Sequence, residues 1–268
     1  MKMLQRLLLL FLTLTLTVSV AADAQGQKKK KKKKAAPPQH SAQELNQLSQ
    51  VDSLLHAYRT PAARQALGDL KEARWSASVM ITLGRILEQE KQYEAAEARL
   101  KKASELAPKN PVPWAWLGWT YQHQKQEAKA KQAYQKAESL AQGVVRANAK
   151  NPNGHLYLGI AQAYLGKYGL AAQSLNKARE LAPGSATAVY HLGVTRALQE
   201  QWKPAVDLLT KALEMDDDMA YAYYYRGQAA SKINNKGMLI ADFEKFIQLA
   251  PNAPEAPIAQ RTLAAVRR

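Results

Sequence analysis

The sequence predicts an all-α protein, a solenoid of about five stacked helix pairs with a further helical pair before them and a single cap helix after them. Two observations lead to this prediction. No segment of useful length has the two-residue alternation of a β-strand. A glycine also recurs at steps of 34, 41, 34 and 34 residues, as Gly84, Gly118, Gly159, Gly193 and Gly227. A period of this length is typical of supersecondary units that stack on their neighbours, and not of one closed core.

Each of these glycines defines position 8 of a 34-residue unit, and the predicted units span residues 77–110, 111–144, 152–185, 186–219 and 220–253. Small residues at positions 8, 20 and 27 allow two antiparallel helices to approach closely. A large apolar residue at position 24 fills the space between the helices, as Leu100, Tyr134, Leu175, Leu209 and Phe243. Proline at position 32 of three units ends the second helix, as Pro108, Pro183 and Pro251.

This pattern resembles the tetratricopeptide repeat (TPR) family. The second unit carries the fullest match, with Trp114, Leu117, Gly118, Tyr121, Ala130, Tyr134 and Ala137. The resemblance extends over residues 77–253, and it implies a right-handed superhelix whose first helices line a concave groove for a protein or peptide partner. The fifth unit departs from the pattern, because Leu239 and Phe246 replace alanines. We therefore expect its helices to be splayed or packed differently.

Seven extra residues, 145–151, separate the second unit from the third. They amount to about two helical turns, so an apolar face keeps its register across them. Gly143 lies either inside one long helix or at its end, with a short second piece after it. We favour one long helix, with or without a kink, that protrudes from the stack.

Both flanks of the repeat region carry helix signals. Ser41 and Glu44 have the spacing of a capping box, and Thr60-Pro61 places a capping residue before a proline. Residues 41–76 are therefore predicted to form a helical pair that caps the first unit. Residues 254–268 are predicted to form a cap helix with an apolar side made of Ile258, Leu263 and Val266.

Residues 1–22 have the form of a secretory signal peptide. Lys2 and Arg6 precede a run from Leu7 to Val20 that is apolar apart from threonine and serine, and small residues follow it. An uncleaved membrane anchor is the alternative, although the run is short for a bilayer span. We expect an exported protein, periplasmic or extracellular, with inner-membrane anchoring as the alternative. The chain has no cysteine, which excludes a lipid-modified lipoprotein and disulfides.

Residues 23–40 are predicted to form a disordered tether. They contain seven consecutive lysines, Lys28, Lys29, Lys30, Lys31, Lys32, Lys33 and Lys34. Such a block repels itself and buries no apolar surface. The lysines are candidates for contact with an anionic membrane surface, and the whole chain is basic, with a formal net charge of +16. A solvated linker and a nuclear or nucleic-acid tag are the alternatives, and nucleic acid is the less favoured partner.

The sequence carries no enzyme signature. The five histidines lie in no metal-binding arrangement, and without cysteine there is no thiolate nucleophile. No glycine-rich phosphate loop is present, because the repeated glycines fall inside predicted helices. We expect no catalytic residue, no cofactor and no metal.

The resemblance also implies which residues face the groove, because the family places groove-facing side chains at positions 2, 5, 9, 12 and 13 of each unit. Our candidates for partner binding are Arg85, Trp119, His123, Tyr164, Tyr190, Tyr221, Tyr224 and Gln228. We expect the aromatic members to be exposed and to anchor an extended or helical segment. The alternative is that the cap helices or the insert fill this groove.

The expected function is that of a non-catalytic, exported TPR scaffold that binds a partner protein and assists complex assembly at the cell envelope. The alternative is a tether that binds polyanions or a membrane surface through the lysine segment and the basic body. Salt separates the two, since binding through counterion release weakens steeply with ionic strength.

Overall fold

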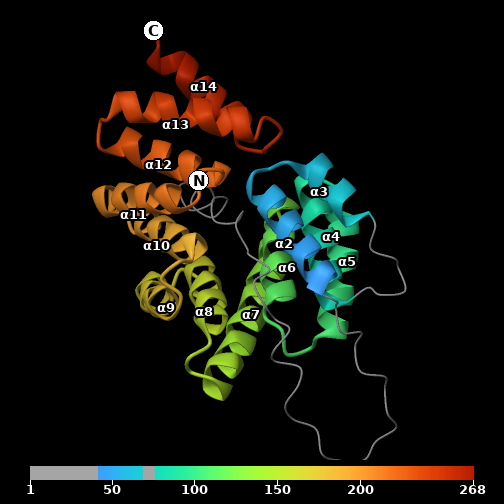
Figure 1. Cartoon of the computed structure of the whole chain (residues 1–268). Coiled ribbons are helices and arrows are strands. Elements are labelled where there is room, and N and C mark those ends of the chain that lie inside the picture. The colour runs from blue at the N-terminus through green and yellow to red at the C-terminus, as the bar shows by residue number, and fades with distance from the viewer. Residues whose placement is uncertain (1–41, 69–75) are drawn as a thin grey trace, which may run out of the picture.

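The computed structural model describes residues 42–68 and 76–268 (Figure 1). Within these two ranges all regular secondary structure is helical, with thirteen helices and no strand. The all-α prediction is therefore confirmed. None of these helices combines the length and the apolarity that crossing a bilayer requires. The predictions for residues 1–22 and 23–40 lie outside the described residues.

The helices follow one another as packed pairs, and a single helix closes the chain. The pairs are α2 (Ala42–His56) with α3 (Thr60–Leu67), α4 (Ala77–Gln89) with α5 (Tyr93–Leu106), α6 (Val112–His123) with α7 (Glu127–Ala147), α8 (Pro152–Tyr164) with α9 (Tyr168–Leu181), α10 (Ala186–Leu198) with α11 (Trp202–Met215), and α12 (Ala220–Lys232) with α13 (Lys236–Leu249), followed by α14 (Ala256–Val266). This order of helix pairs is the predicted solenoid.

The turn within each pair has the same backbone form. Position 15 of all five units has a positive φ, between 58° and 75°, at Lys91, Lys125, Gly166, Glu200 and Asn234. The next residue then donates its N–H back across the turn, as from Gln92 to the Leu87 carbonyl at 2.8 Å. This is the hydrogen bond that closes a helix whose last residue is left-handed. The chain therefore reverses direction in the same way five times.

The N-terminal pair α2–α3 repeats this turn. Tyr58 has a φ of 56°, and Arg59 donates its N–H to the Leu54 carbonyl at 2.8 Å. In this register Ala63 stands at position 20, where a small residue is needed, and it is fully buried. The pair is thus a sixth copy of the unit, in which Val51 takes the place of the glycine.

The repeated glycines allow the two helices of a pair to touch. A Cβ added to Gly118 would lie 2.5 Å from the Tyr134 ring, and one added to Gly84 would lie 2.7 Å from Leu100. Gly159, Gly193 and Gly227 meet the corresponding side chains Leu175, Leu209 and Phe243 at 2.6–2.9 Å. The large residue at position 24 therefore occupies the space that the missing side chain leaves.

The extra residues before the third unit lengthen one helix. The second helices α5, α9, α11 and α13 each have 14 residues, whereas α7 has 21, and Gly143 lies inside it. The prediction of one long helix is therefore correct. The added turns do not stand alone, because Val144 and Val145 pack against Gly154 in the first turn of α8.

The fifth pair is not splayed, but it is packed differently from the others, because Phe246 stands where they have alanine. Phe246 is fully buried, and its ring lies 5.3 Å from that of Tyr221 and 4.9 Å from that of Tyr224. The larger residues of α13 therefore fill the space between the tyrosine side chains of α12. The pair stays packed because the large residues on one helix are matched by the spacing of the tyrosines on the other.

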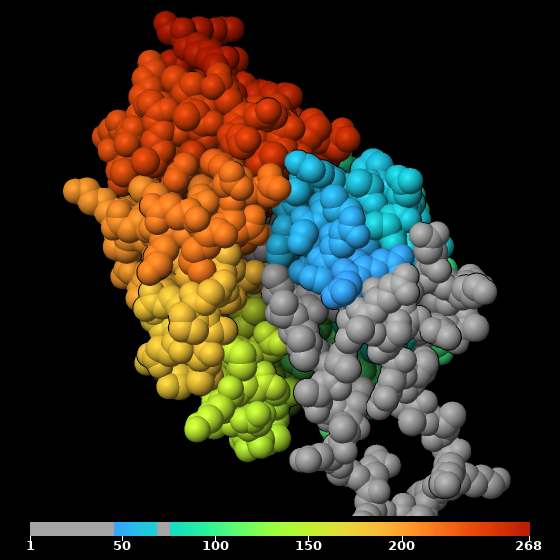
Figure 2. All heavy atoms as spheres, viewed as in Figure 1, coloured from blue at the N-terminus to red at the C-terminus, as the bar shows by residue number. Residues whose placement is uncertain are grey.

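The superhelix brings its first and last units into contact. The rings of Tyr58, between α2 and α3, and Tyr221, on α12, have centroids 6.1 Å apart. His56 lies 3.9 Å from Asp216, just before α12. In Figure 1 the pair α2–α3 faces α12 and the turn between α13 and α14, and in Figure 2 its atoms touch those of the C-terminal units.

Candidate partner-binding face

The first helix of each pair lies on the inner side of the superhelix. From α4 to α12, each first helix contacts the first helix of the next pair. Among the described residues, the second helices of successive pairs make no comparable contact, so the stack curves towards the first helices. All eight residues predicted for partner binding lie on these inner helices: Arg85, Trp119, His123, Tyr164, Tyr190, Tyr221, Tyr224 and Gln228.

The expectation that the aromatic members of this set are exposed was wrong. Trp119 and Tyr190 are 0% exposed, Tyr221 and Tyr224 are 1% exposed, and Tyr164 is 4% exposed. Gln228 is half-buried. The curve is tight enough for side chains from different units to pack on one another. A double change of Tyr190 and Tyr224 to alanine would thus remove core contacts as well as any binding contacts.

The N-terminal pair covers the inner face of α4. Arg85 pairs with Asp52 of α2, and its guanidinium lies 5.1 Å above the Trp116 ring. Gln89 donates to the Leu55 carbonyl at 2.8 Å and accepts from the Thr60 hydroxyl at 2.6 Å. The alternative that a cap helix fills the groove therefore holds at this end.

A buried ion pair follows on α4 and α6. His123 Nδ1 lies 2.5 Å from Glu88 Oε1, and the Trp119 and His123 rings have centroids 4.3 Å apart. Burial lowers the pKa of His123, but the charge and hydrogen bond of Glu88 raise it more, so the net pKa is above its usual value. The imidazole is thus held in its charged form more strongly than in water.

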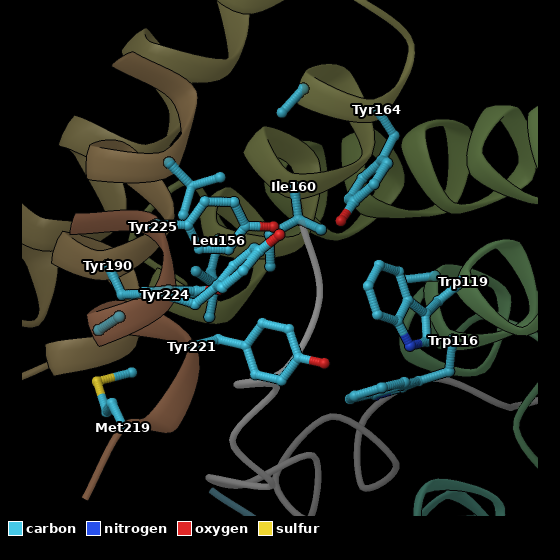
Figure 3. Packing of buried hydrophobic residues seen from close by; sticks show 14 of the residues in the cluster. Trp116, Trp119, Leu156, Ile160, Tyr164, Tyr190, Met219, Tyr221, Tyr224 and Tyr225 are labelled. Atoms are coloured by element: carbon cyan, nitrogen blue, oxygen red, sulfur yellow. The ribbon is translucent and has the colours of Figure 1, made fainter. Parts of the chain in front are cut away.

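A cluster of tyrosines continues the face on α10 and α12. Tyr190 packs edge-on against Tyr225 with centroids 6.1 Å apart, and Tyr224 stacks on Phe243 at 5.7 Å. Figure 3 shows Tyr221 across a common interior from Trp116 and Trp119, with Tyr164 on the same side as Trp119. The rings of four inner helices therefore converge.

Sequence reasoning missed Trp116 and Tyr225. Both stand at position 6, which the family pattern does not assign to the groove. The available signal was the run of aromatic residues from Tyr221 to Tyr225. Side chains this close in sequence point to different sides of a helix, so they cannot all face outwards.

Glu255 and Tyr58 were also missed. Glu255 precedes α14, is 2% exposed, and accepts a hydrogen bond from the Tyr221 hydroxyl. It stands at position 2 of the unit that would follow the fifth, and this position was a usable signal. Nothing local to Tyr58 indicates its contact with Tyr221, because 163 residues separate them.

Several polar atoms of this face are buried without a hydrogen-bond partner in the described chain: Glu88 Oε2, His123 Nε2, Tyr190 Oη, Tyr225 Oη and Glu255 Oε1. Together they offer acceptors, hydroxyl groups and a ring nitrogen on one inner surface. Within residues 42–68 and 76–268 no cluster of three metal-ligating side chains occurs. These atoms are hydrogen-bonding groups that the described chain leaves unsatisfied, and each of them is buried.

Residues 87–135 match the family model described as tetratricopeptide repeat. These residues are TPR sequence, and helix pairs of the same architecture continue on both sides of them. The chain is similar to a thermophilic TPR protein from Thermus thermophilus, at 18% identity and a TM-score of 0.55, over 71% of this chain and 98% of that one. A chain of the APC/C hetero-tetramer Cut9-Hcn1 is similar at 18% identity and a TM-score of 0.56.

The second similarity covers 82% of this chain and 42% of the other protein. At such identities the similarities establish the fold. A search of curated proteins gives no match.

Proposed function

We propose that this TPR protein is a non-catalytic scaffold that binds an extended segment of a partner protein along the inner face of its first helices. The TPR fold supports a role in protein interaction, since repeat stacks present long curved surfaces. The observation that carries the proposal is the set of buried polar atoms on this face without a partner in the described chain, among them Tyr190 Oη and Tyr225 Oη.

A bound segment would satisfy these atoms. A buried donor or acceptor without a partner costs about 1–3 kcal/mol. An extended peptide supplies one N–H and one C=O per residue, and so it is suited to a surface that needs both. The surrounding rings, including Trp119 and Tyr224, would supply apolar contact area to its side chains.

One end of the inner face remains accessible. Leu198 and Gln228 are half-buried and Lys232 is exposed, and all three lie towards the C-terminal ends of α10 and α12. A segment that enters here reaches the tyrosine cluster first.

Cross-linking from defined positions tests this proposal. The photoreactive residue benzoylphenylalanine is placed at Leu198 or Gln228, and at the exposed Lys211 of α11 as the matched outer control. We expect the two inner positions to cross-link one and the same partner protein in the cell of origin, and Lys211 to cross-link none of it. Equal cross-linking from Lys211 would contradict binding at the inner face.

Export and action at the cell envelope form the second part of the proposal. They rest on the charged start, the apolar run Leu7–Val20 and the small residues after it. The mature protein is expected to begin near Asp23 or Gln25 and to be found outside the cytoplasm. N-terminal sequencing of the fractionated protein tests this, and recovery of the chain from the cytosol with Met1 intact would contradict it.

Replacing the lysine run distinguishes the scaffold from the alternative function of a polyanion-binding tether. If changing Lys28–Lys34 to serine abolishes partner capture while inner-face changes leave it intact, the protein is a polyanion-binding tether. We expect instead an altered association rate and salt dependence, with capture retained.

A further inference from the structure

The carboxylate of Glu255 accepts a hydrogen bond from Tyr221 on the inner face. Burial raises the pKa values of Tyr58, Tyr164, Tyr190, Tyr221 and Tyr225, which lie on four segments of the chain, and the charge of Glu255 adds to each rise. It acts in the same way on Tyr93, whose pKa rises to about 12 through burial, Glu88 and Glu255. Tyrosines of several units therefore lie within electrostatic reach of one carboxylate.

Glu255 has no counter-charge of its own in the described chain. No lysine, arginine or histidine nitrogen of these residues lies within 4.0 Å of it; its hydrogen bonds come from the Tyr221 hydroxyl, on Oε2, and from its own backbone N–H. The nearest positive group that it senses is His123, which is already paired with Glu88 at 2.5 Å. A buried carboxylate without a cation is costly, since it loses its hydration and gains no ion pair. Burial accordingly raises the pKa of Glu255 above its usual value, and a bound cation would oppose this rise.

The surroundings of Glu255 have the chemistry of a site for an organic cation. Faces of tyrosine rings attract cations, and an alkyl stem packs well against such rings. Two further groups nearby, Tyr190 Oη and Tyr225 Oη, are buried without a hydrogen-bond partner and offer lone pairs to an ammonium or guanidinium. These hydroxyls are independent of the carboxylate and point to the same kind of guest.

We propose that Glu255, with the tyrosines around it, takes a lysine or arginine side chain of the segment bound along the inner face. This inference rests on the proposed function, because the cation belongs to the bound segment. It adds a specificity rule: the partner segment carries a basic residue where it crosses the meeting point of α12, α14 and the N-terminal pair.

The test uses the full chain and n-butylammonium, the charged end of a lysine side chain, with n-butanol as the uncharged probe of equal length. Binding is followed by the chemical shifts of tryptophan indole N–H groups, two of which belong to Trp116 and Trp119 in this interior. We expect saturable shifts with n-butylammonium and a Kd at least tenfold higher for n-butanol. Equal affinity of the two probes, or no saturable shift with either, would overturn the inference.

Two variants assign the effect to the carboxylate. Glu255→Gln is expected to remove the preference for the cation, whereas Glu255→Asp is expected to keep it. Glu97→Gln changes the carboxylate that accepts from the Tyr121 hydroxyl on the outer side, at 3.0 Å, and is the matched control that leaves the preference unchanged. A preference that persists in folded Glu255→Gln would refute the assignment.

Two further outcomes separate this inference from the proposed function. If cross-linking from Leu198 and Gln228 succeeds while the cation preference is absent, the scaffold function stands and the cation site does not exist. If changing Lys28–Lys34 to serine strengthens n-butylammonium binding tenfold or more, the site is occupied by the chain's own lysines, and the assignment to a partner's side chain is wrong. We expect no change in that variant.

Discussion

The glycines of this protein differ in what surrounds them. Gly118 has the Tyr134 ring within 2.5 Å of the place where a Cβ would stand, whereas Gly143, inside α7, has nothing within 4 Å. Both lie in helix interiors, so backbone propensity alone would favour alanine at either. The side chain packed against each glycine therefore decides whether a change to alanine raises or lowers the free energy of unfolding.

Gly118→Ala is expected to lower the free energy of unfolding by about 1–3 kcal/mol, through overpacking against Tyr134. Gly143→Ala is expected to raise it by about 0.5–1 kcal/mol. Urea unfolding followed by circular dichroism measures both. A loss of stability on Gly143→Ala would show that α7 needs flexibility at this residue.

The Glu88–His123 pair gives a prediction for titration. The pKa of His123 is raised above its usual 6.5, because Glu88 outweighs the effect of burial. Protonated His123 therefore makes its full contribution to the free energy of unfolding below about pH 6.5, and this contribution is lost as the pH rises through the folded-state pKa of His123. We expect Glu88→Gln to lower the pKa of His123, since the charge of Glu255 is then the one remaining influence that opposes burial. NMR titration of the imidazole protons measures this, and an unchanged midpoint in Glu88→Gln would disprove the coupling.

At the scale of the helix pair, most of the architecture could be predicted from the sequence. The period of 34 residues, the small residue at position 8 and the large one at position 24 follow directly from how two helices touch. The length of α7 followed from the seven added residues. The identity of α2–α3 as a further copy did not, because Val51 replaces the glycine and the turn signal is a backbone angle that Tyr58 adopts without any distinctive residue type.

The shared left-handed turn leads to an element-scale prediction. Glu200 adopts a φ of 61° at a cost that glycine does not have, and Gly166 occupies the same position with a φ of 75°. We expect Glu200→Gly to raise the free energy of unfolding by about 0.5–1 kcal/mol and Gly166→Ala to lower it by about 1 kcal/mol or more. Thermal unfolding of the two variants checks this. Changes of the opposite sign would mean that the positive φ at this position does not determine the stability of the turn.

At the scale of the whole molecule, the sequence did not indicate that the inner aromatic side chains are buried. Curvature is the sum of small rotations between neighbouring units, and no single residue encodes that sum. Trp119 and Tyr221 were correctly placed on inner helices, but their exposure depends on how close the first and last units come. The candidate site was therefore predictable as a set of positions and not as a surface.

The contact between the ends can be measured directly. We expect Tyr58→Asn, which keeps a residue tolerant of positive φ but removes the ring, to increase the distance between the N-terminal pair and α14. Tyr58→Phe keeps the ring and is the control. Cysteines introduced at the exposed Ser49 and Arg261 can carry spin labels, since the chain has no cysteine of its own. An unchanged spin–spin distance in Tyr58→Asn would show that the ring does not hold the ends together.

The meeting of Tyr58 with Tyr221 also bears on how the protein unfolds. In an open array of repeats, the terminal units have one neighbour each and fray first, so local opening spreads inwards from either end. Here the two terminal units are neighbours of each other, and each loses contacts on two sides when it opens. Fraying at one end therefore weakens the other, and the array behaves as one cooperative unit. Amide protons in the outermost helices should consequently exchange with solvent about as slowly as those in the middle.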